Sequence, residues 1–193
     1  SQDVPGCYAQ YVVHRAENVI RVPDGPPDEA LASVELAMCI ATVFRTLEGM
    51  DAIRGRSFGV AGLGPAGLIA IQMAKAAGAA TVIGFDLLPK RRELACRIGA
   101  TTCYDQQGEL PEVPAWPERP RLQSSVDCVG AKASVEFLMD RTTDVVALFG
   151  VQRTDYVYGP RHNDLTLCGY KGHSRESAEY AVSLIREGKL NLA

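Results

Sequence analysis

Apolar positions along the chain change their period several times, and each change predicts a new element. Between residues 7 and 23 apolar and polar side chains alternate irregularly, which predicts one or two short strands ending at the turn Pro23–Pro27. Residues 28–48 then place apolar side chains at near-helical spacing, and Gly49 offers a natural stop. These segments predict a short N-terminal β segment followed by a long helix.

From residue 57 onward, short apolar runs alternate with helical patterns. The predicted strands are residues 58–61, 81–85, 101–104, 126–129, 145–149 and 165–168. The predicted helices are residues 66–77, 89–98, 131–140 and 174–187, whereas four prolines exclude a regular helix across residues 105–121. Continuous apolar strands alternating with helices are typical of a parallel sheet that helices cover on both faces. We therefore predict an α/β fold with a doubly wound, mostly parallel sheet.

Composition narrows the function classes. The 193 residues carry 20 Lys and Arg against 23 Asp and Glu, a formal net charge of -3. A nucleic-acid binder needs a concentrated positive surface, so this balance argues against a nucleic-acid partner. No apolar run reaches the roughly 18 residues of a membrane span, and residues 1–6 show no signal peptide. We expect a cytoplasmic protein that does not bind membranes.

A glycine-rich turn joins the first of these predicted strands to its helix. Gly62, Gly64 and Gly67 satisfy G-x-G-x-x-G, and Asp86 ends the next strand. In a dinucleotide site the first glycine permits the tight turn, the second lets the backbone approach a pyrophosphate, and the third lets the helix pack closely. The helix N-terminus then faces the phosphates. The predicted cofactor-binding residues of the turn are Gly62, Leu63, Gly64, Pro65, Ala66 and Gly67.

Asp86 bears on the choice between NAD and NADP. Its carboxylate would accept hydrogen bonds from the adenosine ribose and repel a 2′-phosphate, which favours NAD. Lys90, Arg91 and Arg92 follow closely, and we include Arg91 among the cofactor candidates because it could meet the ribose or a 2′-phosphate. Two alternatives stay open: an aspartate that only caps a turn, and a basic run that is only the solvated start of a helix.

Several stretches follow one another in the order of a known family. Residues 6–13 read GCYAQYVV and residues 53–68 read IRGRSFGVAGLGPAGL. The other matching stretches are residues 18–24, 72–79, 97–100, 167–170 and 184–192. On these stretches the chain resembles the zinc-type alcohol dehydrogenases of the medium-chain dehydrogenase/reductase family. The resemblance implies a Rossmann dinucleotide-binding domain over residues 28–193, preceded by a remnant of the GroES-like catalytic domain over residues 1–27.

The same resemblance implies an activity: hydride transfer between NAD and an alcohol or polyol, with zinc only in a full-length enzyme. The family's catalytic motifs do not occur in this chain, so we predict no catalytic residue and no metal ligand in it. One family zinc ligand does come from the segment leading into the cofactor domain, where Glu35 and Cys39 lie. Without partner ligands we expect a surface carboxylate and a core thiol. The dispersed His14, His162 and His173 also lack metal-ligand spacing.

The resemblance adds cofactor and partner predictions outside the turn. Thr42 corresponds to a family threonine that packs on the nicotinamide, with a plain helix residue as the alternative. The ends of two predicted strands fall where the cofactor lies across such a sheet, although they could equally be core strand ends. These residues are Cys128, Val129, Phe149, Gly150 and Val151. Because the family pairs through its last strand, we expect a homodimer through the edge near residues 165–169.

Two other functions remain possible at this point. One is a non-catalytic module that binds nucleotide or mediates oligomerisation. The other is an S-adenosylmethionine-dependent methyltransferase, which also uses a glycine turn followed by an acidic residue. In that motif the third glycine would fall at Ala66, and no acidic residue precedes Gly62 where the motif needs one.

Overall fold

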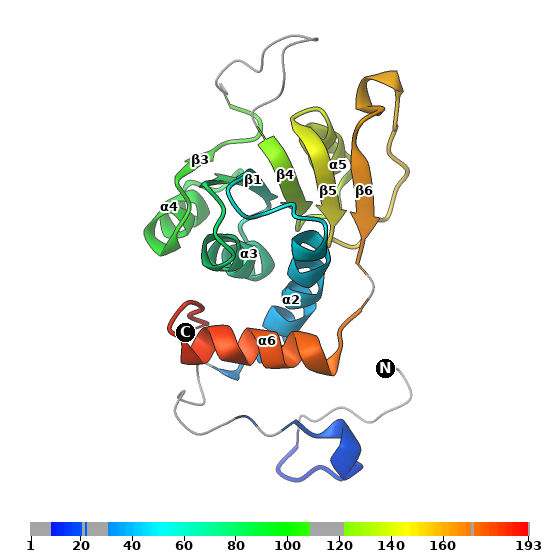
Figure 1. Cartoon of the computed structure of the whole chain (residues 1–193). Coiled ribbons are helices and arrows are strands. Elements are labelled where there is room, and N and C mark those ends of the chain that lie inside the picture. The colour runs from blue at the N-terminus through cyan, green and yellow to red at the C-terminus, as the bar shows by residue number, and fades with distance from the viewer. Residues whose placement is uncertain (1–8, 21, 23–30, 109–121, 171, 193) are drawn as a thin grey trace.

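The central feature of the computed structural model is a parallel β-sheet (Figure 1). The structure describes residues 9–20, 22, 31–108, 122–170 and 172–192. Across these residues six strands, all parallel, lie in the order β3-β2-β1-β4-β5-β6. Their bounds are β1 (Ser57–Ala61), β2 (Thr81–Phe85), β3 (Thr102–Tyr104), β4 (Leu122–Asp127), β5 (Thr142–Leu148) and β6 (Thr166–Gly169). This order is that of the doubly wound Rossmann fold, so the predicted fold class is confirmed.

Helices cover both faces of the sheet. In the described residues they are α2 (Val34–Gly49), α3 (Pro65–Ala76), α4 (Pro89–Ile98), α5 (Lys132–Met139) and α6 (Arg175–Arg186), with single 3-10 turns η1 (Ala16–Asn18) and η2 (Pro160–His162). Proline opens α3 and α4, where its missing N–H costs no helical hydrogen bond. In Figure 1, α5 lies behind the sheet and α3 in front of it. No helix in this part of the chain is long and apolar enough to cross a membrane.

Two apolar cores lie on opposite faces of the sheet. Val145 belongs to the core under α2, α3 and α6, whereas the next residue, Val146, belongs to the core under α5. In the first core the fully buried rings of Phe44 and Phe58 have centroids 5.6 Å apart. In the second, Leu138 of α5 is fully buried. Burial of a side chain of this size contributes about 1.5–3 kcal/mol, so both helical layers hold the sheet in place.

Two strands begin earlier than the apolar pattern predicts. β4 starts at Leu122 rather than at residue 126, and β5 starts at Thr142 rather than at residue 145. Their first halves contain the fully buried Ser124 and Ser125. Ser125 Oγ lies 2.8 Å from Thr142 Oγ1, so a cross-strand hydrogen bond satisfies the hydroxyls of Ser125 and Thr142 inside the core. A pattern that counts only apolar positions misses such strands.

The N-terminal β segment predicted over residues 7–23 is not found in its described part. Residues 9–20 and 22 contain the 3-10 turn η1 and no strand. Tyr11 and Val13 are 90% and 97% exposed, which fits a segment without the neighbouring strand that a β-strand needs. The rest of this prediction, the helix start at residues 28–30 and most of the proline-rich stretch, residues 109–121, lie outside the described residues.

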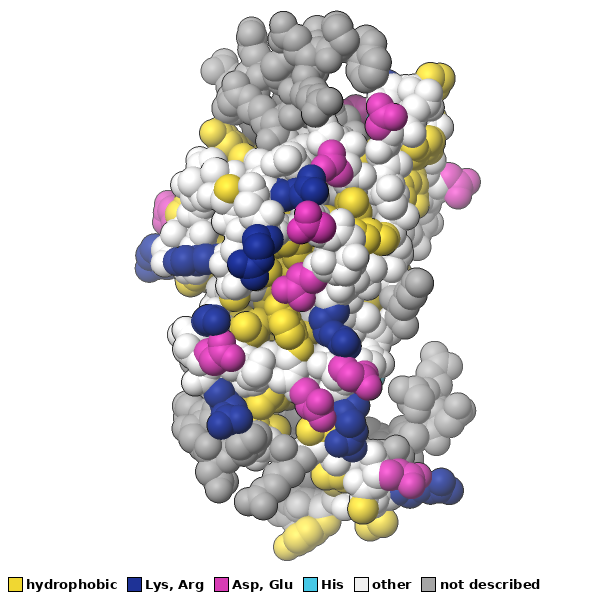
Figure 2. Space-filling view, in the orientation of Figure 1, with side chains coloured by type: hydrophobic (Ala, Val, Ile, Leu, Met, Phe, Trp, Pro, Cys, Tyr) yellow, Lys and Arg dark blue, Asp and Glu magenta, His cyan; other side chains and the backbone are white. Residues whose placement is uncertain are grey.

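The surface carries charges of both signs. Figure 2 shows Lys and Arg side chains interspersed with Asp and Glu over the face it presents, with hydrophobic side chains between them. This mixture agrees with the small net charge, and on this face no block of one sign stands out among the described residues.

Candidate cofactor site

The carboxyl ends of the strands define one edge of the sheet. Because all six strands run parallel, the loops that follow them meet at this edge. From β1 the chain adds β2 and β3 on one side of the sheet, and then β4, β5 and β6 on the other side. The direction in which strands are added therefore reverses between β1 and β4. Ligands of open α/β sheets bind at such a switch point. In Figure 1 the arrowheads of β4, β5 and β6 point toward α2 and α6.

The three glycines of the turn after β1 have different surroundings. Gly62 has φ +84°, and a Cβ there would lie 2.5 Å from Val129 Cγ2. A Cβ on Gly67 would lie 1.8 Å from the carbonyl oxygen of Gly62. A Cβ on Gly64 would meet no atom within 4 Å. The fold itself therefore requires glycine at residues 62 and 67, whereas the space above Gly64 is open to a ligand.

The start of α3 can receive an anion. Gly64 is the N-cap and makes no side-chain capping bond, and Pro65 is the first helical residue. The first hydrogen bond of the helix runs from the Leu68 N–H to the Gly64 carbonyl at 2.9 Å. The preceding N–H groups, of Ala66 and Gly67, lie in the first turn, where an α-helix has no carbonyl of its own to offer. With the helix dipole they make this end favourable for phosphate.

Asp86 lies beside this turn with its carboxylate almost fully buried. The side chain accepts hydrogen bonds from the N–H groups of Leu63 and Leu88, each at 2.8 Å, and lies 3.5 Å from the guanidinium of Arg91. The residue is only 6% exposed. Asp86 therefore does cap the turn, as the alternative interpretation expects. A carboxylate offers about four acceptor positions, so Asp86 can still accept hydrogen bonds from ribose hydroxyls. Arg92 points elsewhere and donates to the backbone carbonyl of Asp86 at 2.7 Å.

The loops after β4 and β5 contact each other at the same edge. A Cβ on Gly150 would lie 2.2 Å from the Gly130 nitrogen, so the two loops are in direct backbone contact. Val129 and Val151 are 47% and 73% exposed there. Cys128 is enclosed, and burial raises the pKa of its thiol well above the usual range. The structure thus brings the predicted residues after β4 and β5 onto one surface with the glycine turn.

Sequence reasoning missed Asp127, which orders this edge. Its fully buried carboxylate accepts hydrogen bonds from the Gly130 N–H at 2.8 Å and the Ser134 hydroxyl at 2.7 Å. Gln152 Nε2 contacts it at 3.3 Å. The available signal was an acidic residue ending an apolar strand, followed by glycine three positions later. Asp127 therefore holds the loops after β4 and β5 in place.

Thr42 is placed differently from the other candidates. It lies in the middle of α2, and its hydroxyl donates to the Ser177 hydroxyl of α6 at 2.8 Å. Ser177 is itself buried and is held by Ser174, the N-cap of α6. In the structure Thr42 therefore joins two helices.

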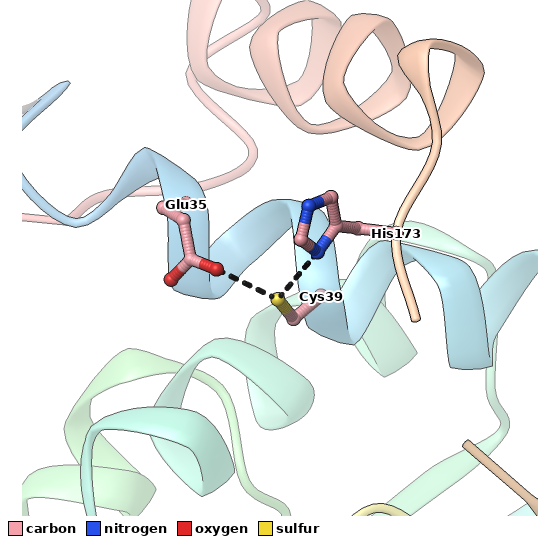
Figure 3. Close-up of side chains that lie close together, drawn as sticks. All are labelled: Glu35, Cys39 and His173. Atoms are coloured by element: carbon pink, nitrogen blue, oxygen red, sulfur yellow. Dashed lines mark hydrogen bonds between the residues drawn. The ribbon is translucent and has the colours of Figure 1, made fainter. Parts of the chain in front are cut away.

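A second group of polar side chains lies between α2 and the start of α6. Figure 3 shows Glu35 and Cys39 on successive turns of α2, with His173 reaching them from the loop before α6. The Cys39 thiol donates to Glu35 Oε1 at 3.2 Å, and its Sγ lies 3.7 Å from His173 Nδ1. Burial raises the pKa of Cys39; a hydrogen bond with Tyr170 opposes the shift, and the bond to Glu35 adds to it.

Tyr170 connects this group, the Glu35–Cys39–His173 cluster, to the cofactor edge. Tyr170 directly follows β6, and its N–H donates to the Leu148 carbonyl at 3.1 Å. Its ring packs edge-on against Phe149, with centroids 5.2 Å apart. Its hydroxyl forms a hydrogen bond with Cys39. The cluster therefore lies at the same edge of the sheet as the glycine turn.

The fold and the edge just described are those of Rossmann cofactor-binding domains as a class. Residues 65–183 match the sequence profile of the family described as zinc-binding dehydrogenase. The chain belongs to this zinc-binding dehydrogenase family, which confirms the resemblance drawn from its motifs.

Curated relatives cover different parts of the chain. L-Threonine 3-dehydrogenase of Bacillus licheniformis is 41% identical over 109 residues, which are 56% of this chain and 30% of that protein. L-Threonine 3-dehydrogenase of Pyrococcus horikoshii is 31% identical over 200 residues, covering 98% of this chain and 56% of that protein. The chain thus spans little more than half the length of this relative.

Solved structures share the fold. Galactitol-1-phosphate dehydrogenase of Escherichia coli superposes with a TM-score of 0.82 and 25% identity, over 97% of this chain and 57% of that one. Acetophenone reductase of Geotrichum candidum, in complex with NAD, has a TM-score of 0.75 and 20% identity, over 91% and 50% of the two chains. A zinc-binding dehydrogenase of Sinorhizobium meliloti, bound to NADP, has a TM-score of 0.69 and 22% identity, over 81% and 48%. The shared fold therefore accompanies either dinucleotide.

Proposed function

We propose that this chain is the NAD(H)-binding domain of a zinc-dependent alcohol or polyol dehydrogenase. The observation that carries the proposal is the open space above Gly64 at the uncapped start of α3, beside the buried carboxylate of Asp86. We assign dinucleotide binding to residues 28–193 and regard residues 1–27 as part of a catalytic domain.

Different residues of the chain would bind different parts of the dinucleotide. The N–H groups at the start of α3 would bind the pyrophosphate, and Asp86 would accept hydrogen bonds from the adenosine ribose. Val129 and Val151, exposed at the edge, would offer apolar contact to the nicotinamide half together with Phe149 and Gly150. When bound, the nicotinamide supplies the hydride acceptor for an alcohol carbon. The protein's contribution is to hold that ring in one orientation.

The preference for NAD rests on charge. In the proposed complex the carboxylate of Asp86 would face the adenosine ribose, and it would repel a 2′-phosphate. Arg91, 3.5 Å from that carboxylate and half exposed, partly offsets this repulsion. We therefore expect NADH to bind more tightly than NADPH.

Fluorescence titration with NADH tests the proposal. The chain should bind NADH without oxidising alcohols by itself, because the family resemblance assigns the catalytic ligands to another domain. Asp86→Ala should weaken NADH binding roughly 10- to 100-fold, since charged hydrogen bonds contribute about 1.5–3 kcal/mol. Asp86→Ala should also reduce the difference in affinity between NADH and NADPH.

Asp144→Ala is the matched control. Asp144 lies in the first half of β5, away from the carboxyl edge of the sheet, and forms an ion pair with Arg56. Replacement of Asp144 should therefore leave NADH affinity unchanged. Absence of NADH binding at millimolar cofactor would contradict the proposal, and unchanged affinity in Asp86→Ala would remove Asp86 from the site. A rise in melting temperature with S-adenosylmethionine but not with NADH would favour a methyltransferase instead.

A further inference from the structure

We propose that Cys96 and Cys103 are a peroxide-sensitive cysteine pair, which oxidation closes to a disulfide between α4 and β3. Cys96 lies in the last turn of α4, and Cys103 is the middle residue of β3. β3 is the first strand in the order of the sheet, and α4 packs beside it (Figure 1). The proposal stands on the placement of these two thiols and does not depend on NADH binding.

The two thiols share one open cavity of about 600 Å³. Its lining consists of Arg92, Glu93, Cys96, Arg97 and Cys103. Cys96 is exposed, Cys103 is partly buried, and their thiols form a hydrogen bond. A disulfide needs its two sulfurs to approach to about 2.05 Å. Because the thiols already face each other in this cavity, we expect side-chain movement to bring them together without unfolding α4 or β3.

The turn between the two cysteines is held by backbone hydrogen bonds. Gly99 ends α4 with φ +139°, a conformation that glycine adopts readily. Its N–H and that of Ala100 both donate to the Ala95 carbonyl, at 3.1 and 2.9 Å. The short connection from α4 to β3 therefore keeps Cys96 and Cys103 near each other.

The two thiols differ in how readily they react. Burial raises the pKa of the Cys103 thiol to about 12, and the hydrogen bond with Cys96 and the negative charge of its thiolate add to this shift. A hydrogen bond with the Gly84 backbone and the charge of Arg92 oppose it. The thiolate is the nucleophile, so a thiol that keeps its proton reacts slowly. The exposed Cys96 should therefore meet peroxide first, and Cys103 should react second.

The cavity around the pair carries more positive than negative charge. Arg92 and Arg97 line it together with one acid, Glu93. Arg92 is held there by the Asp86 carbonyl at 2.7 Å and the Asp105 carboxylate at 3.3 Å. A cation beside a cysteine favours the thiolate. An accessible thiol next to cations and a second thiol is the environment of cysteines that peroxide oxidises reversibly.

The reaction balances with hydrogen peroxide as the oxidant. The Cys96 thiolate attacks one peroxide oxygen, so an S–O bond forms, the O–O bond breaks, and hydroxide leaves and is protonated to water. The sulfur has then lost two electrons and is a sulfenic acid. The Cys103 thiolate attacks this sulfur, so an S–S bond forms, the S–O bond breaks, and a second water leaves. Two thiols and one peroxide thus give one disulfide and two waters.

Peptide mapping after peroxide treatment tests the pair. The reduced parent chain has six thiols and should lose two of them, which dithiothreitol should restore. Tryptic cleavage after Arg97 separates the two cysteines, so the disulfide should link residues 93–97 to residues 98–121. In Cys103→Ala the link should be absent. Cys96 should then reach sulfinic acid at least about tenfold faster, because no second thiol traps the sulfenic acid. In Cys96→Ser, Cys103 should remain a thiol.

Cys168→Ser is the matched control. Cys168 is a partly buried cysteine on β6, at the other end of the strand order from β3, so its replacement should leave the link unchanged. Each variant replaces cysteine by a smaller residue and should stay folded, which circular dichroism checks. Sulfinic acid at Cys96 of the parent chain without the link, or no reaction of Cys96 at millimolar peroxide, would overturn the proposal. A link found only in covalent dimers would overturn it as well.

Discussion

At the residue scale, two glycines of one turn serve different purposes. A Cβ on Gly67 would overlap the backbone carbonyl of Gly62, and backbone cannot move aside as a flexible side chain can. A Cβ on Gly64 would meet nothing, and Gly64 has φ -72°, which any residue adopts. Glycine at residue 67 is therefore required by the fold, whereas glycine at residue 64 is not, and we propose that Gly64 serves the approach of a ligand.

Alanine at each position should separate these roles. Gly67→Ala should lower the free energy of unfolding by at least about 1–3 kcal/mol, the usual cost of overpacking. Gly64→Ala should cost less than about 1 kcal/mol, the range of N-cap changes, yet weaken NADH binding at least about tenfold because the methyl group occupies the phosphate's approach. Urea unfolding and NADH titration measure the two effects. If Gly64→Ala folds and binds NADH with the affinity of the parent chain, Gly64 is not needed for the approach of the phosphate.

Sequence patterns predicted which residues lie close together where one motif contains them. Gly62, Gly67 and Asp86 fall within one strand–turn–helix–strand unit, whose geometry is local. Asp127 was missed because its one signal, an acidic residue at the end of an apolar strand with glycine three positions later, is too short to be specific. The contact between His173 and Cys39 was not predicted, because only the packing of α6 on α2 brings these two residues together.

At the element scale, α2 packs against α6, so the first and last α-helices among the described residues are in contact. The Thr42 hydroxyl bonds Ser177 at 2.8 Å, and the Tyr180 hydroxyl donates to Glu48 at 3.1 Å. Thr46, one turn after Thr42, bonds only within its own helix, to the Thr42 carbonyl at 3.0 Å, among the contacts of the described residues. The two threonines therefore form a matched pair for testing the interface.

Thr42→Val should lower the free energy of unfolding by about 1 kcal/mol, because a buried interhelical hydrogen bond is lost. Thr46→Val should stay within about 0.5 kcal/mol, since back-bonding to the same helix contributes little. The midpoint of urea unfolding, at constant slope, measures both. NADH affinity should be unchanged if Thr42 acts through packing. Equal stability of the two variants with weaker NADH binding in Thr42→Val would instead make Thr42 a cofactor contact.

Elements were predictable where burial and apolar character coincide. β2 agrees with its predicted range at both ends, because its residues are mostly apolar and the strand lies between β1 and β3. The starts of β4 and β5 were not, because Ser124, Ser125 and Thr142 are polar yet buried. The predicted N-terminal strand shows the opposite error, since its apolar residues have no sheet to join in the described part of the chain.

At the scale of the whole molecule, β6 is the last strand of the sheet among the described residues. Tyr170, directly after β6, points its N–H toward β5. Because N–H groups alternate along a strand, that of Cys168 also points toward β5, whereas those of Leu167 and Gly169 point to the outer edge. Thr166 and Gly169 are exposed there. No strand among the described residues pairs with this edge. Such an edge readily accepts another strand, which supports the expected homodimer through residues 165–169.

Proline at Gly169 tests this assembly with a control at the same position. Gly169→Pro removes one outward N–H from each subunit and leaves the bonds to β5 intact, so it should weaken dimerisation at least about tenfold. Gly169→Ala keeps the N–H, and its Cβ would meet no atom within 4 Å, so it should dimerise like the parent chain. Sedimentation velocity over a concentration series measures both dissociation constants. A parent chain that stays monomeric at every concentration, or equal dimerisation of the two variants, would exclude this edge as the interface.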